Sequence, residues 1–338
     1  MPGRIIRHNT DDLTTNNKKM NTRKLILATI SAILFSGIFT ISADAQNLSG
    51  TYMFAKRDTC NLFFDVYDPT PGSETTFEGI QKPTLLFVYG GGFVGGFRSN
   101  ERYFPWFKIL NDNGYKLITI DYRLGLKGVP MSFSLIGKIK TAKNTVKAVE
   151  IGAEDLFSAV NFIVENAGTL GVDPKNIVLV GNSSGAIISL GAENFICNGE
   201  PIAAGLPEGF NFKGLISFAG AIVDDNGTPK YAKEPCPTIF MHGTADGTVQ
   251  YRKTQVFKLG MWGTDILAGI FKKNGYNYCV YRFHEHKHDI ADNYAALWPY
   301  QKYFLEQNIM LGRRCIIDAY IDDPSVPSWE AATLDSLY

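Results

Sequence analysis

A serine stands at the centre of a Gly-x-Ser-x-Gly pentapeptide that spans residues 181–185. An apolar run, residues 176–180, precedes it, and a second one, residues 186–190, follows it. This order predicts a buried strand, a sharp turn and a helix, with the Ser183 hydroxyl lifted out of the turn. The two glycines let neighbouring backbone approach without a Cβ clash. Ser183 is therefore a candidate nucleophile, and an ordinary strand-to-helix turn is the alternative.

A serine nucleophile needs a base, a carboxylate that orients the base, and donors for the oxyanion. Asp246 follows an apolar strand and a glycine turn, so we expect it to be the orienting carboxylate; a turn-capping role is the alternative. His288 comes later in the chain, directly before a predicted final helix, and is the expected base. His286 is the second candidate for that role.

The three histidines His284, His286 and His288 also admit a metal site. No cysteine or second ligand group lies at suitable spacing beside them in the sequence. We therefore expect neither a metal ion nor another cofactor.

Three glycines follow the apolar run 84–89 and precede Phe93. Glycines at the end of a strand expose backbone N–H groups and allow a reacting carbonyl to come close. A phosphate-binding loop would need Gly-Lys-Ser or Gly-Lys-Thr at this point, and the sequence lacks it. The glycines are therefore candidate oxyanion donors.

Short apolar runs alternate with helical stretches from residue 84 onwards. This alternation predicts βαβ crossovers and an α/β fold, with a mostly parallel central sheet and helices on both faces. The predicted strands are residues 84–89, 116–121, 176–180, 213–218, 238–241 and 278–283. Amphipathic periodicity predicts helices over residues 151–165 and 290–307.

Ahead of these runs, the alternating segments 51–56 and 61–67 predict an N-terminal antiparallel hairpin. Two connections, residues 125–147 and 257–270, are longer than a minimal sheet needs. Long connections in a domain are often functional, so we expect cap-like pieces near the substrate, with surface decoration as the alternative.

The 338 residues include 33 basic and 33 acidic side chains, so the formal charges cancel. Zero net charge without a clustered Lys/Arg stripe argues against nucleic acid as a partner. With 45% hydrophobic residues and no evident linker or repeat, residues 46–338 are expected to form a single domain.

Residues 1–45 have the pattern of a leader with a signal peptide. A basic segment, residues 20–24, precedes an apolar run, and Ala43 and Ala45 fit an Ala-x-Ala cleavage site. We expect a true start at Met20, cleavage near Ala45 and export to the periplasm or the medium. A membrane anchor is the alternative, but the run is short for a span and the cleavage site follows at once, so no stable anchor is expected.

Five cysteines fall in the expected mature chain, namely Cys60, Cys197, Cys236, Cys279 and Cys315. An exported protein can hold disulfides, but their connectivity cannot be read from the sequence. Cys236 and Cys279 lie near the starts of successive predicted strands, so their sulfurs would be close if those strands were neighbours in register. A pair of buried free thiols is the alternative.

Taken in chain order, these segments resemble one family. They are Tyr89-Gly90-Gly91-Gly92-Phe93, Asp121-Tyr122-Arg123-Leu124, Gly181-Asn182-Ser183-Ser184-Gly185, His242-Gly243-Thr244-Ala245-Asp246 and His288. The chain is similar, over residues 51–308, to carboxylesterases of the α/β-hydrolase superfamily, near the hormone-sensitive-lipase-like and feruloyl or acetylxylan esterase branches. The resemblance implies an α/β-hydrolase fold, a triad of Ser183, Asp246 and His288, and oxyanion donors at Gly91, Gly92 and Ser184.

The chain departs from the family pattern at several positions. Tyr89 replaces the histidine that usually precedes the three glycines. In the family that histidine generally supports the loop and is not a catalyst. Asn182 and Ser184 flank the nucleophile where an acidic residue or alanine is common, which alters the polarity of the pocket. Asn182 and Phe93 are the candidate substrate contacts, and Asp155 matches a recurrent acidic position that is structural.

These features together predict a serine carboxylic-ester hydrolase that acts on small or carbohydrate-linked esters through an acyl-enzyme intermediate. A peptidase or a small-amide hydrolase would use the same machinery and is the first alternative. A non-catalytic binding module on a hydrolase fold is the second, although such relatives usually lose the serine or the histidine. The acyl group, the alcohol and the oligomeric state stay open.

Overall fold

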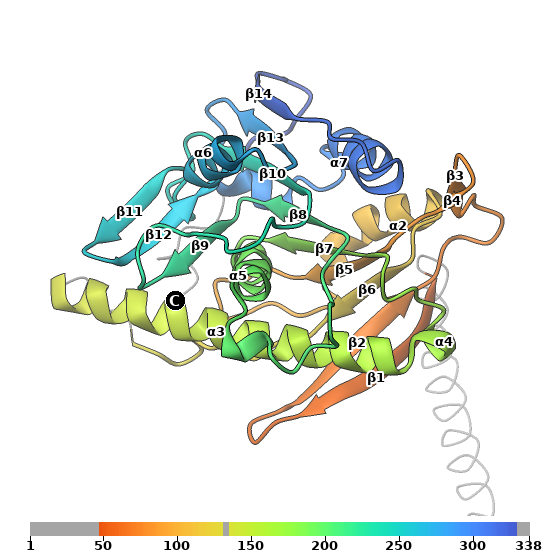
Figure 1. Ribbon diagram of the computed structural model, residues 1–338, viewed down its shortest axis with the longest axis horizontal. Coiled ribbons are helices and arrows are strands. Elements are labelled where there is room, and N and C mark those ends of the chain that lie inside the picture. The colour runs from red at the N-terminus through yellow and green to blue at the C-terminus, as the bar shows by residue number, and fades with distance from the viewer. Residues whose placement is uncertain (1–46, 131–134, 330–338) are drawn as a thin grey trace, which may run out of the picture. The chain divides into compact units, whose positions relative to one another are not determined.

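A nine-stranded sheet forms the centre of the molecule (Figure 1). The structure is a computed structural model that describes residues 47–130 and 135–329. The predicted leader, its start at Met20 and its cleavage site near Ala45 lie outside the described residues. The strands run in the order β1 (Leu48–Lys56), β2 (Asn61–Tyr67), β6 (Leu117–Ile120), β5 (Thr84–Val88), β7 (Ile177–Asn182), β8 (Gly214–Phe218), β10 (Thr238–Gly243), β13 (Tyr278–Phe283) and β14 (Ile317–Ile321).

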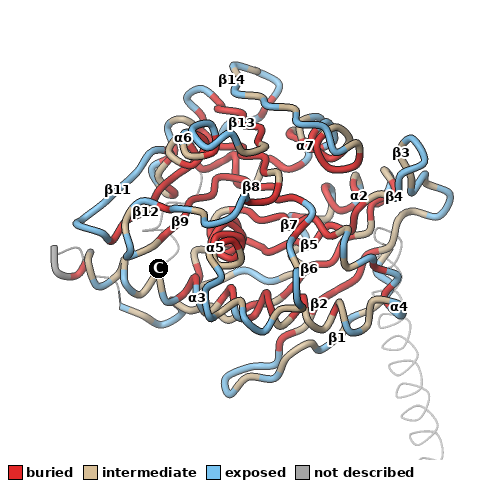
Figure 2. Tube along the Cα trace, viewed as in Figure 1, coloured by how far each residue is buried: buried red, intermediate tan, exposed pale blue. Residues whose placement is uncertain are grey.

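The sheet is mostly parallel, as the alternation of apolar runs predicted. Strands β1 and β2 form the expected antiparallel hairpin, and β2 pairs antiparallel with β6. Every other neighbouring pair in the sheet is parallel. The inner strands β5, β6, β7, β8, β10 and β13 are buried throughout, which explains why they are continuous apolar runs (Figure 2).

Helices cover both faces of the sheet. The helical elements are η1 (Glu101–Tyr103), α2 (Phe104–Asp112), α3 (Leu135–Glu165), α4 (Ala167–Leu170), α5 (Ser184–Asn198), η2 (Pro201–Ala203), α6 (Thr264–Asn274), η3 (His288–Asp292), α7 (Trp298–Phe304) and the π-helical turn η4 (Leu305–Met310). Helices α3 and α5 pack side by side (Figure 1). On the opposite face, Trp106 of α2 donates a hydrogen bond to Gln301 of α7 at 3.0 Å.

Two predicted helices have different bounds in the structure. The helix predicted over residues 151–165 begins at Leu135, so most of the long connection predicted over residues 125–147 is helical. The helix predicted over residues 290–307 is interrupted, and α7 begins only at Trp298. Pro299 lies in the first turn of α7, where a residue without an N–H group is tolerated.

A small second sheet lies beside the central one. It consists of β9 (Ala221–Asp224), β12 (Leu259–Gly263) and β11 (Lys253–Val256), and we call it the accessory sheet. Residues 257–270, predicted as a cap-like connection, therefore contain a hairpin tip, a strand and the start of α6. Figure 1 shows the accessory sheet above the N-terminal part of α3. A two-stranded ribbon, β3 (Thr76–Phe77) with β4 (Ile80–Gln81), completes the strands of the described residues.

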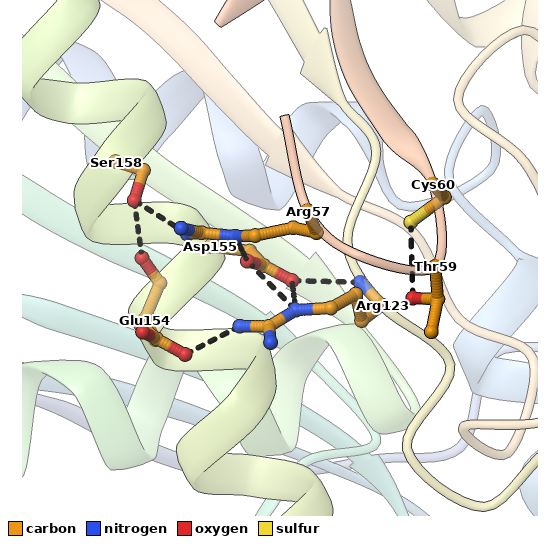
Figure 3. Close-up of polar contacts among 7 residues, drawn as sticks. All are labelled: Arg57, Thr59, Cys60, Arg123, Glu154, Asp155 and Ser158. Atoms are coloured by element: carbon orange, nitrogen blue, oxygen red, sulfur yellow. Dashed lines mark hydrogen bonds and ion pairs between the residues drawn. The ribbon is translucent and has the colours of Figure 1, made fainter. Parts of the chain in front are cut away.

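An ion-pair cluster joins α3 to the β1–β2 hairpin and to the loop after β6 (Figure 3). Asp155 of α3 is fully buried and lies between two arginines. Arg57, at the turn of the β1–β2 hairpin, donates to its Oδ1 at 2.9 Å, and Arg123, in the loop after β6, donates from Nε and from its backbone N–H. Arg123 also contacts the exposed Glu154. The cluster thus holds three chain segments together, consistent with the structural role expected of Asp155.

None of the five cysteines, all of which lie among the described residues, forms a disulfide. Strands β10 and β13 are parallel neighbours, but Cys279 lies opposite Ile239, three residues beyond Cys236. The close approach of Cys236 and Cys279 considered from the sequence therefore does not occur. Within residues 47–130 and 135–329, no helix is long and apolar enough to cross a membrane.

Candidate active site

Ser183 sits on a sharp turn between β7 and α5, which we call the elbow (residues 181–185). Its φ of 52° and ψ of −123° lie outside the regions that residues other than glycine ordinarily adopt. The elbow is tightly packed, because a Cβ on Gly185 would lie 2.0 Å from the Val88 carbonyl oxygen. Only glycine fits there, so the pentapeptide forms the predicted strand–turn–helix.

The three residues predicted to form a triad lie together at the carboxyl edge of the parallel strands. Ser183 Oγ is 2.8 Å from His288 Nε2, and His288 Nδ1 is 2.7 Å from Asp246 Oδ2. His288 lies in η3, after β13, and Asp246 follows β10. Parallel strands place these loops at the same edge, although the residues are far apart in the chain.

Asp246 is held as a carboxylate by its surroundings. Its Oδ1 accepts hydrogen bonds from the backbone N–H groups of Thr248 and Val249, at 2.8 and 3.0 Å. Its Oδ2 is shared by His288 and His242. Burial alone would raise the pKa of the Asp246 carboxyl, but the hydrogen bonds from the two histidines outweigh it and hold that pKa well below its usual range.

His242 is a part of the site that sequence reasoning did not assign. It is fully buried, and its Nε2 lies 3.0 Å from Asp246 Oδ2 and 3.1 Å from the Val249 carbonyl oxygen. Both partners are acceptors, so the proton belongs on Nε2, and Nδ1 accepts from the Thr264 hydroxyl at 2.9 Å. The signal in the sequence was its place four residues before Asp246, at the end of the strand that precedes Asp246.

The neighbouring histidines point elsewhere. His286 Nδ1 lies 2.6 Å from Asp289 Oδ2, and the backbone N–H of Lys287 donates to Asp289 Oδ1. Asp289 therefore braces this turn. The backbone of His284 pairs with Ile321 of β14. In the described part of the chain, no group of three His, Cys, Asp or Glu side chains is arranged to hold a metal ion.

The glycine loop, residues 90–93, lies directly above the elbow. Gly91 and Gly92 have φ values of 152° and 63°, and Phe93 also has a positive φ, of 64°. The Gly90 N–H donates to Asn182 Oδ1 at 2.7 Å, and the Gly91 N–H donates to Ser184 Oγ at 3.0 Å. The Ser184 N–H belongs to the first turn of α5, where N–H groups lack an intrahelical acceptor. Gly91 thus contacts the residue that follows Ser183, and the oxyanion role of Gly91, Gly92 and Ser184 stays a prediction.

The two residues predicted to contact substrate, Phe93 and Asn182, are both buried. The amide oxygen of Asn182 serves the glycine loop, and the carbonyl oxygen of Phe93 accepts from the Leu126 N–H at 3.0 Å. In this structure both residues support the loop, and a contact with substrate stays a prediction.

The mostly parallel sheet and the elbow are those of the α/β-hydrolase fold, and solved structures agree. The structure of the propionate-bound esterase Est2 from Thermogutta terrifontis superposes with a TM-score of 0.55 and 19% sequence identity. That match covers 79% of this chain and 96% of the other. The apo form of the same esterase gives a TM-score of 0.53 at 20% identity, over 79% of this chain and 97% of the other. At these identities the likeness shows the fold.

Sequence comparison relates the chain to carboxylesterases, which confirms the predicted resemblance. Residues 39–190 match the family described as Carboxylesterase family. Esterase B1 of Culex pipiens is 32% identical over 104 residues, which are 31% of this chain and 17% of that protein. Para-nitrobenzyl esterase of Bacillus subtilis (strain 168) is 25% identical over 158 residues, 47% of this chain and 29% of that protein. The matched segments thus span less than a third of these curated relatives.

Proposed function

We propose that the protein is a serine carboxylic-ester hydrolase that works through an acyl-enzyme. The observation that carries the proposal is the hydrogen-bonded series Ser183–His288–Asp246, with separations of 2.8 and 2.7 Å. Nucleophile, base and orienting carboxylate are within hydrogen-bonding reach in the order that acyl transfer requires. The similarity to carboxylesterases supports the same reaction.

In the first half-reaction, Ser183 Oγ attacks the ester carbonyl carbon and its proton passes to His288 Nε2. The Asp246 carboxylate accepts a hydrogen bond from His288 Nδ1–H, so the lone pair of Nε2 faces the serine. The tetrahedral oxyanion is bound by backbone N–H groups of the glycine loop and of Ser184. The C–O bond to the alcohol then breaks, and the alcohol leaves with the proton from His288.

In the second half-reaction, water attacks the acyl-enzyme carbonyl while His288 accepts a proton from it. A second tetrahedral intermediate collapses, the carboxylic acid leaves, and His288 returns the proton to Ser183. No further reactant is needed, since water supplies the atoms that the two products gain.

An apolar cavity favours small esters with an apolar part over carbohydrate-linked ones. The cavity has a volume of about 510 Å³ and lies between α3 and the accessory sheet. Val223 follows the carboxyl end of β8 and Gly247 that of β10, so these two wall residues lie on the side of the sheet edge that carries Ser183. Its walls include Ile139, Leu259 and Met261. We propose that this cavity receives the apolar acyl or alcohol group.

The direct test of the proposed function is turnover of nitrophenyl acetate, butyrate and longer-chain esters, and of feruloyl esters, by wild type and Ser183→Ala. Ser183→Ala should remain folded and lose a factor on the order of 10⁴ to 10⁶ in rate. Retention of more than a few per cent of wild-type activity would exclude Ser183 as the nucleophile. Within the series, Ala142→Trp, which fills the cavity, should penalise butyrate and longer esters more than acetate. Lys143→Trp, on the exposed side of α3, is its matched control.

Export is a separate part of the proposal, supported by the basic segment, apolar run and Ala43-x-Ala45 site of the sequence. N-terminal sequencing of the protein from its native host should find Gln46 as the first residue. An intact Met1 or Met20 in a cytoplasmic fraction would contradict export.

A further inference from the structure

The two residues that flank the nucleophile bind the glycine loop through their side chains. Asn182 Oδ1 accepts from the Gly90 N–H at 2.7 Å, and Ser184 Oγ accepts from the Gly91 N–H at 3.0 Å. Asn182 and Ser184 are 1% and 2% exposed, so both acceptor side chains are buried. A family member with alanine after the nucleophile could not make the second contact, because alanine has no hydroxyl.

The position of the Ser184 proton follows from the neighbouring tyrosine. Tyr122 Oη donates to the Tyr89 carbonyl oxygen at 2.9 Å, and that bond uses its only proton. Tyr122 Oη also lies 3.3 Å from Ser184 Oγ, so in this contact Ser184 is the donor. The polar groups therefore form one series, from the Gly91 N–H to Ser184 Oγ–H, to Tyr122 Oη–H, to the Tyr89 carbonyl.

The Gly91 N–H group, which the family resemblance implies as an oxyanion donor, is already hydrogen-bonded in this series. The Gly91 N–H is engaged by Ser184 Oγ, and the Ser184 hydroxyl proton points to Tyr122. An oxyanion that forms beside Ser183 can use the Gly91 N–H only by displacing Ser184 Oγ. The contact favours the resting enzyme over the tetrahedral intermediate, and a preference for the ground state raises the barrier.

We propose that Ser184 is a positioning residue that lowers the rate of the reaction. Its hydroxyl oxygen accepts a hydrogen bond from the Gly91 N–H and so withholds that donor from the oxyanion. The inference rests on the proposed esterase function and adds to it a determinant of the oxyanion hole. The hydroxyl gives in return a hydrogen-bond partner to the partly buried N–H group of Gly91 in the free enzyme. The Ser184 hydroxyl thus lowers the catalytic rate and stabilises the folded protein.

The test is the variant Ser184→Ala, which removes the hydroxyl and keeps the backbone N–H. We expect kcat/KM for a nitrophenyl ester to rise about tenfold, part of the 10²- to 10³-fold effect of one oxyanion donor. The inhibition constant of a trifluoromethyl ketone, which forms a tetrahedral adduct with the serine, should fall by a similar factor. The melting temperature should fall by a few degrees, because Gly91 loses its partner. A gain in rate together with a loss in stability is not expected of a structural residue.

Ser189→Ala is the matched control, since Ser189 lies in the same helix and its buried hydroxyl bonds only the Gly185 carbonyl among the contacts described, at 2.8 Å. It should leave kcat/KM and inhibitor affinity at the wild-type values. Ser184→Gly also lacks the hydroxyl and replaces Ser184→Ala if that variant does not fold. An unchanged or lower kcat/KM in Ser184→Ala, with Ser189→Ala at the wild-type value, would overturn the inference alone. Wild-type turnover that Ser183→Ala does not reduce would contradict the proposed function, and with it this inference.

Discussion

Four hydrogen bonds converge on the carboxylate of Asp246, two from backbone N–H groups and two from His242 and His288. With its pKa held well below the usual range of an aspartate, the carboxyl group of Asp246 stays ionised in mildly acidic solution. The stability that these bonds add is present above the pKa of an unfolded aspartate, about 3.9, and is lost only as the pH falls through the lower folded value. Asp246 therefore remains a hydrogen-bond acceptor for the His288 ring wherever its own carboxyl group is ionised.

Substitution by alanine should distinguish the roles of His288 and His286. His288→Ala removes the base, so kcat/KM should fall by a factor on the order of 10⁴ to 10⁶. His286→Ala removes only the contact with Asp289 and should cost less than tenfold. Steady-state kinetics of the two variants on one ester checks this. If His286→Ala abolished turnover and His288→Ala spared it, the geometry of this turn would be contradicted.

Residue types and spacing were sufficient to single out Ser183, Asp246 and His288, because each follows a strongly apolar strand. They were not sufficient for His242, whose contact with Asp246 depends on a bend in the chain after β10. Nor could they show that Ser184 Oγ meets the Gly91 N–H, since those residues are 93 positions apart. Side-chain partners across the fold are set by packing, which periodicity does not encode.

At the scale of elements, the inner strands were predictable because burial on both faces makes each a continuous apolar run. The first residues of helices α3 and α7 were not predictable from the sequence. Helix α3 extends back to Leu135, under the accessory sheet, so tertiary packing and not the amphipathic pattern sets its start. The accessory sheet was missed because β11 is exposed throughout and lacks an alternating apolar pattern.

The ion-pair cluster around Asp155 predicts how two substitutions in α3 change the stability of the protein. Asp155→Ala removes the buried carboxylate that Arg57 and Arg123 share, so the free energy of unfolding should fall by about 1.5–3 kcal/mol. Glu154→Ala removes only an exposed partner of Arg123 and should cost less than about 1 kcal/mol. Urea unfolding of both variants measures the difference. Equal losses would show that Asp155 does not fasten the hairpin and the β6 loop to α3.

At the scale of the whole molecule, the fold was predictable from the alternation of strands and helices, and it alone brings Ser183, Asp246 and His288 to one sheet edge. The same core also holds a carboxyl group that the proposed reaction does not use. Glu193 of α5 is 2% exposed, and its Oε1 accepts from the Cys236 N–H at 2.7 Å and lies 3.5 Å from Cys197 Sγ. Burial raises the pKa of Glu193 above its ordinary value.

This group makes the stability of the molecule depend on pH. Because the pKa of Glu193 is raised, its favourable contribution to the free energy of unfolding is complete below the pKa of an unfolded glutamate, about 4.3. That contribution is lost as the pH rises through the pKa of Glu193 in the folded protein. Glu193→Gln should therefore gain a few degrees in melting temperature over wild type between pH 4 and pH 8. The exposed Glu200→Gln should show no such trend. A constant difference between Glu193→Gln and wild type across this range would contradict the assignment.

Covalent labelling tests most directly whether Ser183 is a nucleophile that His288 activates. A fluorophosphonate probe reacts with an activated serine, and peptide mass mapping locates the adduct. We predict stoichiometric labelling of Ser183 in the wild-type protein, none in Ser183→Ala, and labelling slowed by several orders of magnitude in His288→Ala. An unlabelled wild-type protein, or an adduct on any residue other than Ser183, would contradict the account.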